Sequence, residues 1–289
     1  IKPIEVSQKE MDAFDTLYNN EMSAMTAEFR NTGLSEKEFK SVERSFKSLN
    51  IKLNRYEDEV YFQGPYIGLA AQGAPRNIID ESIEAGSFIF LSDFQKILYN
   101  LAVCYHKSTD KRQKTLLLDY FSSATKAYLN SGWAEGSNMG ALHHLGYSSR
   151  KIAPSFFMMK QELQEKGLLD QISRSLNWYN LAYVVNDETH TKPDLDLFNT
   201  LLYSHYLTSM MHPEKTNAVR HVKLLSEWMS RTFADDTEHG GFKHDGTAWH
   251  HWGHYPAYTN DAIDDAVIVT NKLSLAGFSL TDVGHKALQ

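Results

Sequence analysis

Apolar residues recur at three- and four-residue spacing through most of the chain, which is the pattern of helices that bury one face. Ser7 with Glu10 and Ser35 with Glu38 have the spacing of a capping box at a helix start. Gln95 follows Ser92 at the same spacing, which predicts a third start before FQKILYNLAVCYH. The pattern predicts further helices at about 112–130, 149–166, 170–186, 194–211, 215–233 and 260–276.

Two stretches break this pattern. Residues 56–91 are interrupted by Gly64, Pro65, Gly68, Gly73, Pro75 and Gly86, which predicts a long ordered loop or a small extended region. The second stretch runs from Gly132 to Gly146. Short connections between the other helices favour antiparallel pairs, and an array of pairs that curves into a partial ring leaves a groove lined by loops. We therefore predict an all-α chain with its polar, aromatic and glycine-rich loops at such a groove.

Composition limits the class of protein. The chain has 289 residues, of which 42% are hydrophobic and 22% charged, so it is long enough for one large domain or two small ones. No apolar run approaches the roughly 18 to 20 residues that cross a bilayer, and no signal peptide is visible at the start. The formal net charge of -7 argues against nucleic-acid binding, although a local cleft for a polyanion can still be positive. Cys104 is the only cysteine, which excludes an internal disulfide and predicts a buried, inert thiol.

The densest chemical motif is GGFKHDGTAWHHWGHYPAYTND. It combines four histidines with aromatic rings, and its glycines and a proline predict a loop that enters a helix near Asn260. Such a loop is suited to stacking sugar faces on its rings and to handling protons or anions with its imidazoles. A packed loop whose histidines satisfy backbone groups is the alternative. The histidines are His244, His250, His251 and His254, and the rings include Trp249, Trp252, Tyr255 and Tyr258.

A second motif, GSNMGALHHLGYSSR, places His143 and His144 before a predicted helix. Free backbone N–H groups and the positive end of the dipole at a helix start suit a carboxylate or sulfate. A simple capping loop with a solvated Arg150 fits equally well. Weaker candidates are polar or aromatic residues in the helical segments SLNWYNLAY and LDLFNTLLYSHY, namely Asn177, Trp178, Asn180, Asn199 and His205, for which packing within a core is the commoner explanation.

DGTAWHHWGHYPAY, together with LHHLGYSSR, NWY and DLFNTL in the same order, resembles the chondroitin sulfate ABC lyases of polysaccharide lyase family 8. The resemblance covers about residues 132 to 262 and implies the helical catalytic domain of that family, an incomplete α/α toroid. It maps the catalytic histidine onto His251 and the catalytic tyrosine onto Tyr258. This sequence departs from the family pattern at Trp252, His254 and Ala257.

The resemblance implies β-elimination at the uronic acid of a glycosaminoglycan such as chondroitin or dermatan sulfate. Such an enzyme must neutralise the uronate carboxylate, remove the C5 proton and protonate the leaving oxygen. It implies Tyr258, His251, His143 and His144 as catalytic residues. As substrate-binding residues it implies Trp249, Trp252, His254, Tyr255, Asn199, Asn177, Trp133 and Arg150.

The resemblance also sets expectations for the whole protein. Residues 1–289 are expected to form the helical catalytic domain, as a fragment of a larger, multidomain lyase secreted or periplasmic in a bacterium. The expected partners are the glycosaminoglycan and the remaining domains of the parent chain, with neither nucleic acid nor a membrane span. The chemistry requires no cofactor and no metal at the site, although a structural divalent cation elsewhere in the full-length protein is compatible with it.

Three other functions remain open from the residues alone. His244, Asp245, His250 and His254 have spacing compatible with a metal-dependent hydrolase. Acidic residues near the motif suit the two-carboxylate chemistry of a toroidal glycoside hydrolase; they are Asp235, Asp236, Glu238 and Asp245. A non-catalytic sugar-binding helical module would use Trp249 and Trp252 as platforms.

Overall fold

The computed structural model describes residues 1–56, 59–69, 76–137, 145–186, 195, 197–235, 241–243, 245, 247–250 and 253–288, with side chains left undescribed at 53–56, 59–63 and 76–78. The chain forms two compact units. The central unit is Ser23–Ser175, and the terminal unit combines Ile1–Met22 with Leu176–Gln289. Among the described residues, none of the helices is long and apolar enough to cross a membrane.

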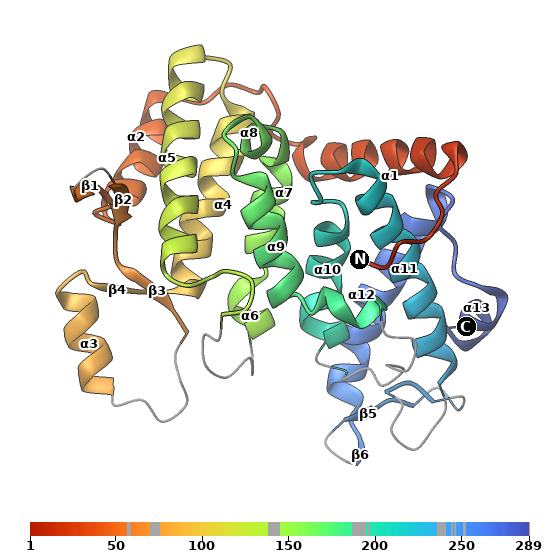
Figure 1. Ribbon diagram of the computed structural model, residues 1–289. Helices are drawn as coiled ribbons and strands as arrows, with labels where there is room; N and C mark the ends of the chain where they lie inside the picture. The colour runs from red at the N-terminus through yellow and green to blue at the C-terminus, as the bar shows by residue number, and fades with distance from the viewer. Residues whose placement is uncertain are drawn as a thin grey trace. The chain divides into compact units, whose positions relative to one another are not determined.

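Most of the described chain is helical (Figure 1), which agrees with the all-α prediction. Helices α1 (Gln8–Thr26) and α9 (Leu169–Tyr179) contain the boundaries between the units. The central unit contains α2 (Glu36–Lys47), β1 (Lys52–Tyr56), β2 (Glu59–Gln63), β3 (Tyr66–Gly68), α3 (Arg76–Glu84), β4 (Phe88–Phe90), α4 (Leu91–Lys107), α5 (Lys111–Asn130), α6 (Leu145–Ser149), α7 (Ile152–Met158) and α8 (Lys160–Glu165). The terminal unit contains the 3₁₀ helix η1 (Ala182–Asn186), the π-helix η2 (Leu197–Leu201), α10 (Leu202–Ser209), α11 (Lys215–Ala234), β5 (Trp249–His250), β6 (Gly253–His254), α12 (Pro256–Leu275) and α13 (Asp282–Leu288).

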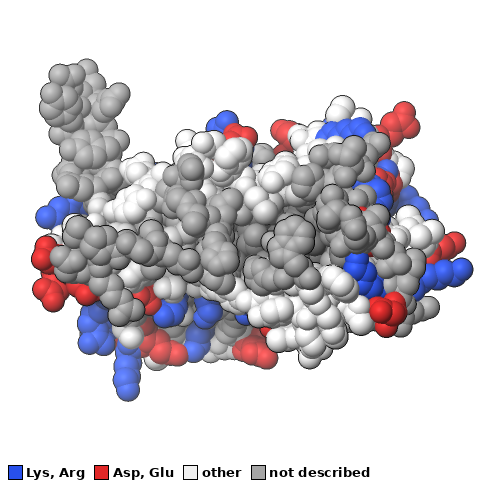
Figure 2. Space-filling model, turned by 90° about the horizontal axis from the view of Figure 1, so that it is seen from below, with Lys and Arg blue, Asp and Glu red and all other residues white. Residues whose placement is uncertain are grey.

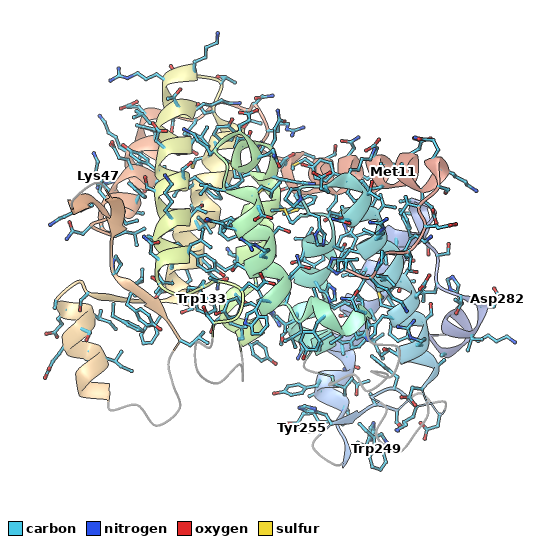
Figure 3. The ribbon with its side chains drawn as sticks, in the orientation of Figure 1. Met11, Lys47, Trp133, Trp249, Tyr255 and Asp282 are labelled. Carbon is cyan, nitrogen blue, oxygen red and sulfur yellow. The ribbon has the colours of Figure 1, made fainter. Side chains whose placement is uncertain are left out.

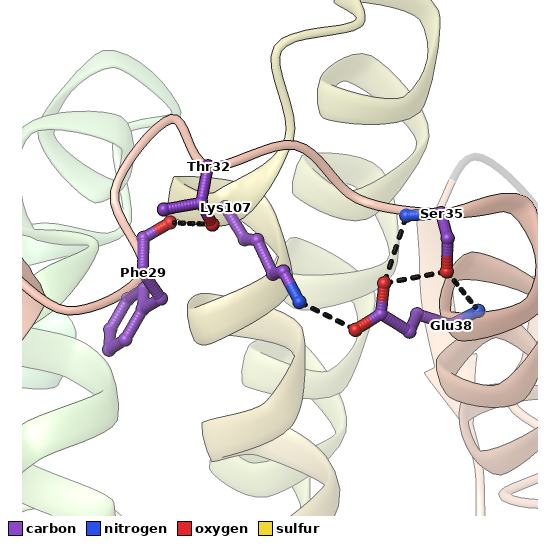
Figure 4. A network of polar contacts seen from close by, with 5 residues as sticks. All are labelled: Phe29, Thr32, Ser35, Glu38 and Lys107. Atoms are coloured by element: carbon purple, nitrogen blue, oxygen red, sulfur yellow. Dashed lines mark hydrogen bonds and ion pairs between the residues drawn. The ribbon is translucent and has the colours of Figure 1, made fainter.

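Both predicted capping boxes form. At α2 the Ser35 hydroxyl accepts from the backbone N–H of Glu38, and the Glu38 carboxylate accepts from the backbone N–H of Ser35 (Figure 4). Lys107 and Ser35 together lower the pKa of Glu38 to about 2. At α1, Glu10 accepts from the backbone N–H of Ser7 in the same way. These contacts lie within four residues, which is why the sequence alone predicts them.

The prediction that Ser92 caps a helix is wrong. The cap position is Phe90, so helix α4 begins two residues earlier than predicted, because β4 pairs in parallel with β3 and leads into the helix. The side chain of Gln95 is instead buried, and its Oε1 accepts from the backbone N–H of Lys151 at 2.8 Å. A contact over such a sequence separation is invisible in a local pattern.

Three predicted helices are interrupted. The segment 149–166 divides into α7 and α8 after α6, and Pro154 lies in the first turn of α7, where its missing N–H is tolerated. The segment 170–186 changes from α9 to η1 at Leu181, whose φ of 55° is left-handed and ends the helix. The segment 194–211 begins as the π-helix η2 and continues as α10.

The predicted irregular region contains more structure than a loop. β1 and β2 form an antiparallel hairpin that starts before residue 56, with Lys52 paired to Gln63. β3 and β4 are parallel, and α3 lies between them in the chain. The prediction of a small extended region is therefore correct for the strands but missed α3.

The core of the central unit is aromatic. Helix α4 packs against α5 and α7, and the buried ring of Tyr128 stacks on Phe94 at 6.1 Å and on Trp133 at 5.5 Å. Cys104 on α4 is half-buried and not fully buried as predicted, and the burial that it has raises the pKa of its thiol to about 11, which agrees with an inert cysteine.

A buried carboxylate joins three helices of the terminal unit. Glu21 of α1, which is 2% exposed, accepts hydrogen bonds from the hydroxyls of Tyr203 and Tyr206 on α10. It also pairs with Lys272 of α12 at 2.6 Å. Every polar group in this network is matched by a partner, so the charge is retained in the core without an orphaned neighbour. The network fixes the position of α12, whose first turn carries Tyr258.

Helix α13 approaches α11 closely. A Cβ atom at Gly284 would lie 2.7 Å from the Cα of Ser230, so only glycine permits this packing. The hydroxyl of Ser230 accepts from the backbone N–H of Thr281 at 3.0 Å and holds the start of α13 in place.

Candidate active-site hairpin

The described residues of the predicted catalytic motif form two successive antiparallel pairings between α11 and α12, which together we call the hairpin. Phe242 pairs with Ala248, and β5 pairs with β6 so that Trp249 opposes His254. Three further backbone hydrogen bonds close the hairpin: Lys243 N–H to the Thr247 carbonyl, Trp249 N–H to the Gly241 carbonyl, and Tyr255 N–H to the Ala248 carbonyl. The described part of the motif is thus an ordered scaffold for its side chains.

Phe242 anchors this hairpin in the core of the terminal unit. Its ring meets Phe198 of η2 edge-on at 5.1 Å and Phe233 of α11 at 5.4 Å. Ala248 is fully buried beside it. With these two positions inside, the neighbouring side chain of Trp249 is directed outward, 43% exposed.

Asp245 shapes the turn of the hairpin. Its carboxylate accepts from both the backbone N–H and the hydroxyl of Thr247, at 2.9 and 2.7 Å. These bonds lower its pKa. An exposed carboxylate engaged by its own turn is a structural feature of the loop, as expected for an Asx turn.

Three rings meet where the hairpin enters α12. The ring of His250 lies 5.7 Å from that of Tyr255 and 5.2 Å from that of Tyr258. The two tyrosine rings lie 4.8 Å apart, so each ring of this triad contacts the other two. His250 therefore restricts the orientation of Tyr258, and Figure 3 shows Tyr255 and Trp249 at the hairpin end of the terminal unit.

Tyr258 lies in the first turn of α12 and not in the loop before it. The helix begins at Pro256, about four residues before the predicted start, because proline is favoured where no N–H is needed. Thr259 donates from its hydroxyl to the carbonyl of Tyr255 and stabilises the turn. The phenol of Tyr258 thus lies near the positive end of the helix dipole.

Two polar side chains of the hairpin suit a sugar bearing negative charge. The ammonium group of Lys243 lies 5.7 Å from the centre of the Trp249 ring. Lys243 is half-buried, whereas His254, on the strand that pairs with Trp249, is exposed. The sequence analysis assigned no binding role to Lys243. The available signal was a basic residue within a motif that is rich in aromatic rings.

The structure contradicts the expectation that Trp133 binds substrate. Trp133 is 1% exposed, and its indole N–H donates to the carbonyl of Ile67 at 2.8 Å. The hydroxyl of Ser175 donates to its carbonyl at 2.7 Å, and one face of the ring packs on Tyr128. The ring is a core residue of the central unit with no open face for a sugar.

The remaining predicted binding residues lie in different settings. Asn199 is buried in η2, which packs against α12 and is the π-helical type of distortion common at functional sites. Asn177 is partly exposed on α9. Arg150 belongs to the central unit, where its guanidinium lies 5.2 Å from the ring of Tyr147. All three stay predictions as substrate-binding residues.

Four predicted site residues lie outside the described residues: His143, His144, His251 and Trp252. His244, Asp236 and Glu238, named for the alternative hydrolase functions, lie outside them as well. Across the parts of the chain with described positions, no three histidine, cysteine, aspartate or glutamate side chains are grouped to hold a metal ion. Sequence reasoning overlooked His250 as a neighbour of Tyr258, since a two-stranded pairing decides that contact.

Comparison with known proteins agrees with the sequence resemblance. A family model described as "Lyase, catalytic" matches residues 2–289. The chondroitin sulfate ABC endolyase of Proteus vulgaris is 29% identical over 208 residues, which is 70% of this chain and 20% of that protein. A chondroitin sulfate ABC exolyase of Bacteroides thetaiotaomicron is 26% identical over 270 residues, covering 89% of this chain and 26% of the relative. The chain thus spans about a fifth to a quarter of the length of these curated relatives.

A solved structure shows the same fold. The chondroitin AC lyase of Streptomyces coelicolor A3, in complex with chondroitin sulphate, aligns over 96% of this chain and 35% of its own, with a TM-score of 0.62 and 14% identity. The likeness confirms the predicted fold class, a helical-toroid arrangement of helix pairs.

Proposed function

Because this chain belongs to the lyase catalytic-domain family, we propose that it cleaves a glycosaminoglycan of the chondroitin type by β-elimination at the uronic acid. The observation that carries the proposal is Tyr258, a phenol at the start of α12 whose ring is held by His250 and Tyr255. Two observations support this choice: the family resemblance of the motif maps the catalytic tyrosine onto Tyr258, and the rings of His250 and Tyr255 contact the ring of Tyr258.

The chemistry explains the residue types. The C5 proton of a uronate is weakly acidic while the carboxylate is ionised, so donors must neutralise that carboxylate and stabilise the enolate-like intermediate. Tyr258 takes the C5 proton or protonates the O4 leaving group, and the positive helix end beside it favours the phenolate that a base requires. His251 assists proton abstraction. One of His143 and His144 supplies the contact to the carboxylate or serves the epimeric uronate from the opposite face.

The hairpin contributes binding. Trp249 offers an exposed ring for the apolar face of a sugar, and Lys243 beside it supplies a positive charge for a sulfate or carboxylate. Trp252, His254, Tyr255, Asn199, Asn177 and Arg150 complete the proposed binding set. Figure 2 shows acidic and basic side chains mixed along the margins of this face, so attraction of a polyanion to this acidic protein depends on local groups such as Lys243.

The proposal extends to the setting of the enzyme. The elimination needs no cofactor, because tyrosine, histidine and polar donors supply each proton transfer and the charge neutralisation. Chondroitin and dermatan sulfate are extracellular polymers, which suits a secreted or periplasmic bacterial protein. The remaining domains of the parent chain are expected partners of this domain.

The test is the product of the reaction. Elimination leaves a conjugated, unsaturated uronate that absorbs ultraviolet light, whereas hydrolysis does not, so absorbance during incubation with chondroitin, dermatan and hyaluronan distinguishes a lyase from a glycoside hydrolase. Tyr258→Phe in the complete protein should lower turnover by about 10² or more and leave substrate binding intact. Tyr18→Phe, on α1 where the ring stacks on Phe14, is the matched control and should keep parental turnover.

Other outcomes would replace the proposal. Near-parental turnover of Tyr258→Phe removes this residue from the chemistry. Cleavage that a strong chelator abolishes favours the metal-dependent hydrolase, and binding without turnover in any form of the protein favours the sugar-binding module.

Unequal loss of dermatan and chondroitin cleavage in His143→Ala or His144→Ala would support a two-sided site, because C5 epimers present their protons to opposite faces.

A further inference from the structure

Three histidines of the terminal unit form a hydrogen-bonded series that the proposed reaction does not use. His205 of α10 and His221 of α11 meet through their Nε2 atoms at 2.9 Å. The Nδ1 atom of His221 meets Nε2 of His212, in the connection between the two helices, also at 2.9 Å. His205 and His221 are fully buried, whereas His212 is half-buried. We call these residues the imidazole chain.

Counting protons shows what the imidazole chain can accept. Each of its two N···N contacts needs one N–H and one lone pair, so each contact holds a single proton. Three neutral rings carry three protons in total, which leaves one for the two outer atoms, Nδ1 of His212 and Nδ1 of His205. One of these outer atoms is therefore bare in the neutral state.

When a fourth proton is added, neither outer nitrogen atom can remain without a proton. With both contacts kept, the two remaining protons must lie on the two outer atoms, whichever ring carries the positive charge. Nδ1 of His205 then becomes an N–H donor. Among the described residues this atom is buried and has no hydrogen-bond partner. A buried donor without an acceptor is strongly disfavoured, so the folded chain resists the proton.

Around the two fully buried rings, within the part of the chain that the structure describes, the groups that act on them give no compensation for a positive charge. The ring of Trp228 lies 6.2 Å from that of His205. The titratable or charged groups that act on His221, so far as the chain is described, are His205, His212 and the amino group of Ile1; no carboxylate is among them. Burial lowers the pKa of His205 to about 3, and burial followed by the neighbouring imidazoles lowers that of His221 well below its usual range.

We propose that the imidazole chain is an acid-sensitive lock between α10 and α11, closed while its three rings are neutral and opened when a proton enters at His212 and forces an N–H onto the buried end. The unfolded or opened chain takes up protons near pH 6.5, whereas His205 in the closed state takes one up only near pH 3. The lock is therefore fully closed above about pH 6.5 and weakens as the pH falls through this window.

Opening would reach the candidate active-site hairpin. Trp228 stacks on Phe198 at 5.4 Å, and Phe198 meets Phe242, the residue that anchors the hairpin. Movement at the junction of α10 and α11 thus disturbs an unbroken series of ring contacts that ends beside Trp249. The lock would couple acidity to the order of the hairpin.

Hydrogen–deuterium exchange of the protein at a series of pH values, corrected for intrinsic rates, tests the lock. Below about pH 6 we expect peptides from α10, α11 and the hairpin to lose protection while α4 and α5 keep theirs. His212→Gln should move the opening to lower pH by about one unit, because a neutral amide cannot take the entering proton. His205→Gln should move it in the same direction, since glutamine has no second ring nitrogen to be left without an acceptor.

The matched control is His285→Gln on α13, a histidine outside the imidazole chain, which should open at the wild-type pH. A folded His212→Gln or His205→Gln protein that also opens at the wild-type pH overturns the proposal. If neither variant folds at neutral pH, ¹⁵N spectra of the wild-type imidazoles decide. Coupled changes in the three rings at the onset of opening support the lock, and independent titration near pH 6.5 with α10 and α11 still protected contradicts it.

Discussion

Trp133 and Trp249 look alike in the sequence, since each follows a glycine-containing turn and each was predicted to bind a sugar. In the structure they are opposites. Trp133 is enclosed in the central unit by Tyr128, Ile67 and Ser175, whereas Trp249 projects from a hairpin whose inward positions are filled by other residues. The difference shows that a ring stays open to a ligand only where neighbouring residues already fill the core.

The largest expected difference concerns stability. Trp133→Ala should lower the free energy of unfolding by about 3–5 kcal/mol, because it leaves a cavity and an unpaired carbonyl at Ile67. Trp249→Ala should change it by less than about 0.5 kcal/mol. Chemical denaturation followed by circular dichroism measures both. Equal losses in the two variants would remove the distinction between the core ring and the surface ring.

A hydrogen bond behind Trp133 allows a subtler test. Ser175→Ala should cost about 1–3 kcal/mol, since the buried carbonyl of Trp133 loses the hydroxyl that donates to it. Ser123→Ala is the control, because its hydroxyl bonds to a carbonyl on the exposed face of α5. Denaturation midpoints that are indistinguishable for these two variants would contradict the role of Ser175.

Replacing Trp249 should lower the affinity for substrate although it leaves the stability of the fold nearly unchanged. Stacking a sugar on an indole removes roughly 60 Å² of apolar surface from water, or about 1.5 kcal/mol, so Trp249→Ala should weaken substrate binding about tenfold. Trp249→Phe retains part of the ring surface, so its affinity for substrate should lie between those of the parent protein and Trp249→Ala. Calorimetric titration with chondroitin oligosaccharides measures this, and unchanged affinity in the alanine variant would leave Trp249 without the proposed role.

The smallest expected effect belongs to Lys243. Replacing it with glutamine should weaken binding by about 0.5–1 kcal/mol, because solvent and salt partly screen a cation that is only half-buried. The dependence of substrate affinity on salt concentration should become shallower at the same time. A salt dependence equal to that of the parent protein would show that Lys243 does not face the polyanion.

Several features of the fold could be predicted because they are local. The capping boxes at Ser7 and Ser35 depend on residues three positions apart, and helical periodicity depends on four. The failure at Ser92 has the opposite origin. Strand β4 pairs with β3 about twenty residues earlier in the chain and moves the helix start, which a window of a few residues does not register.

The sequence by itself determined the all-α class, the family resemblance and the motif that contains Tyr258, since these follow from periodicity and from the order of residues. Only the tertiary structure decided that His250 restrains Tyr258, that Trp133 is buried, and that His205 meets His221 from a second helix. The physical reason is that burial and ring contacts depend on partners distant in sequence. Whether a histidine binds a proton, a substrate or another histidine is set by those partners and not by its own neighbours along the chain.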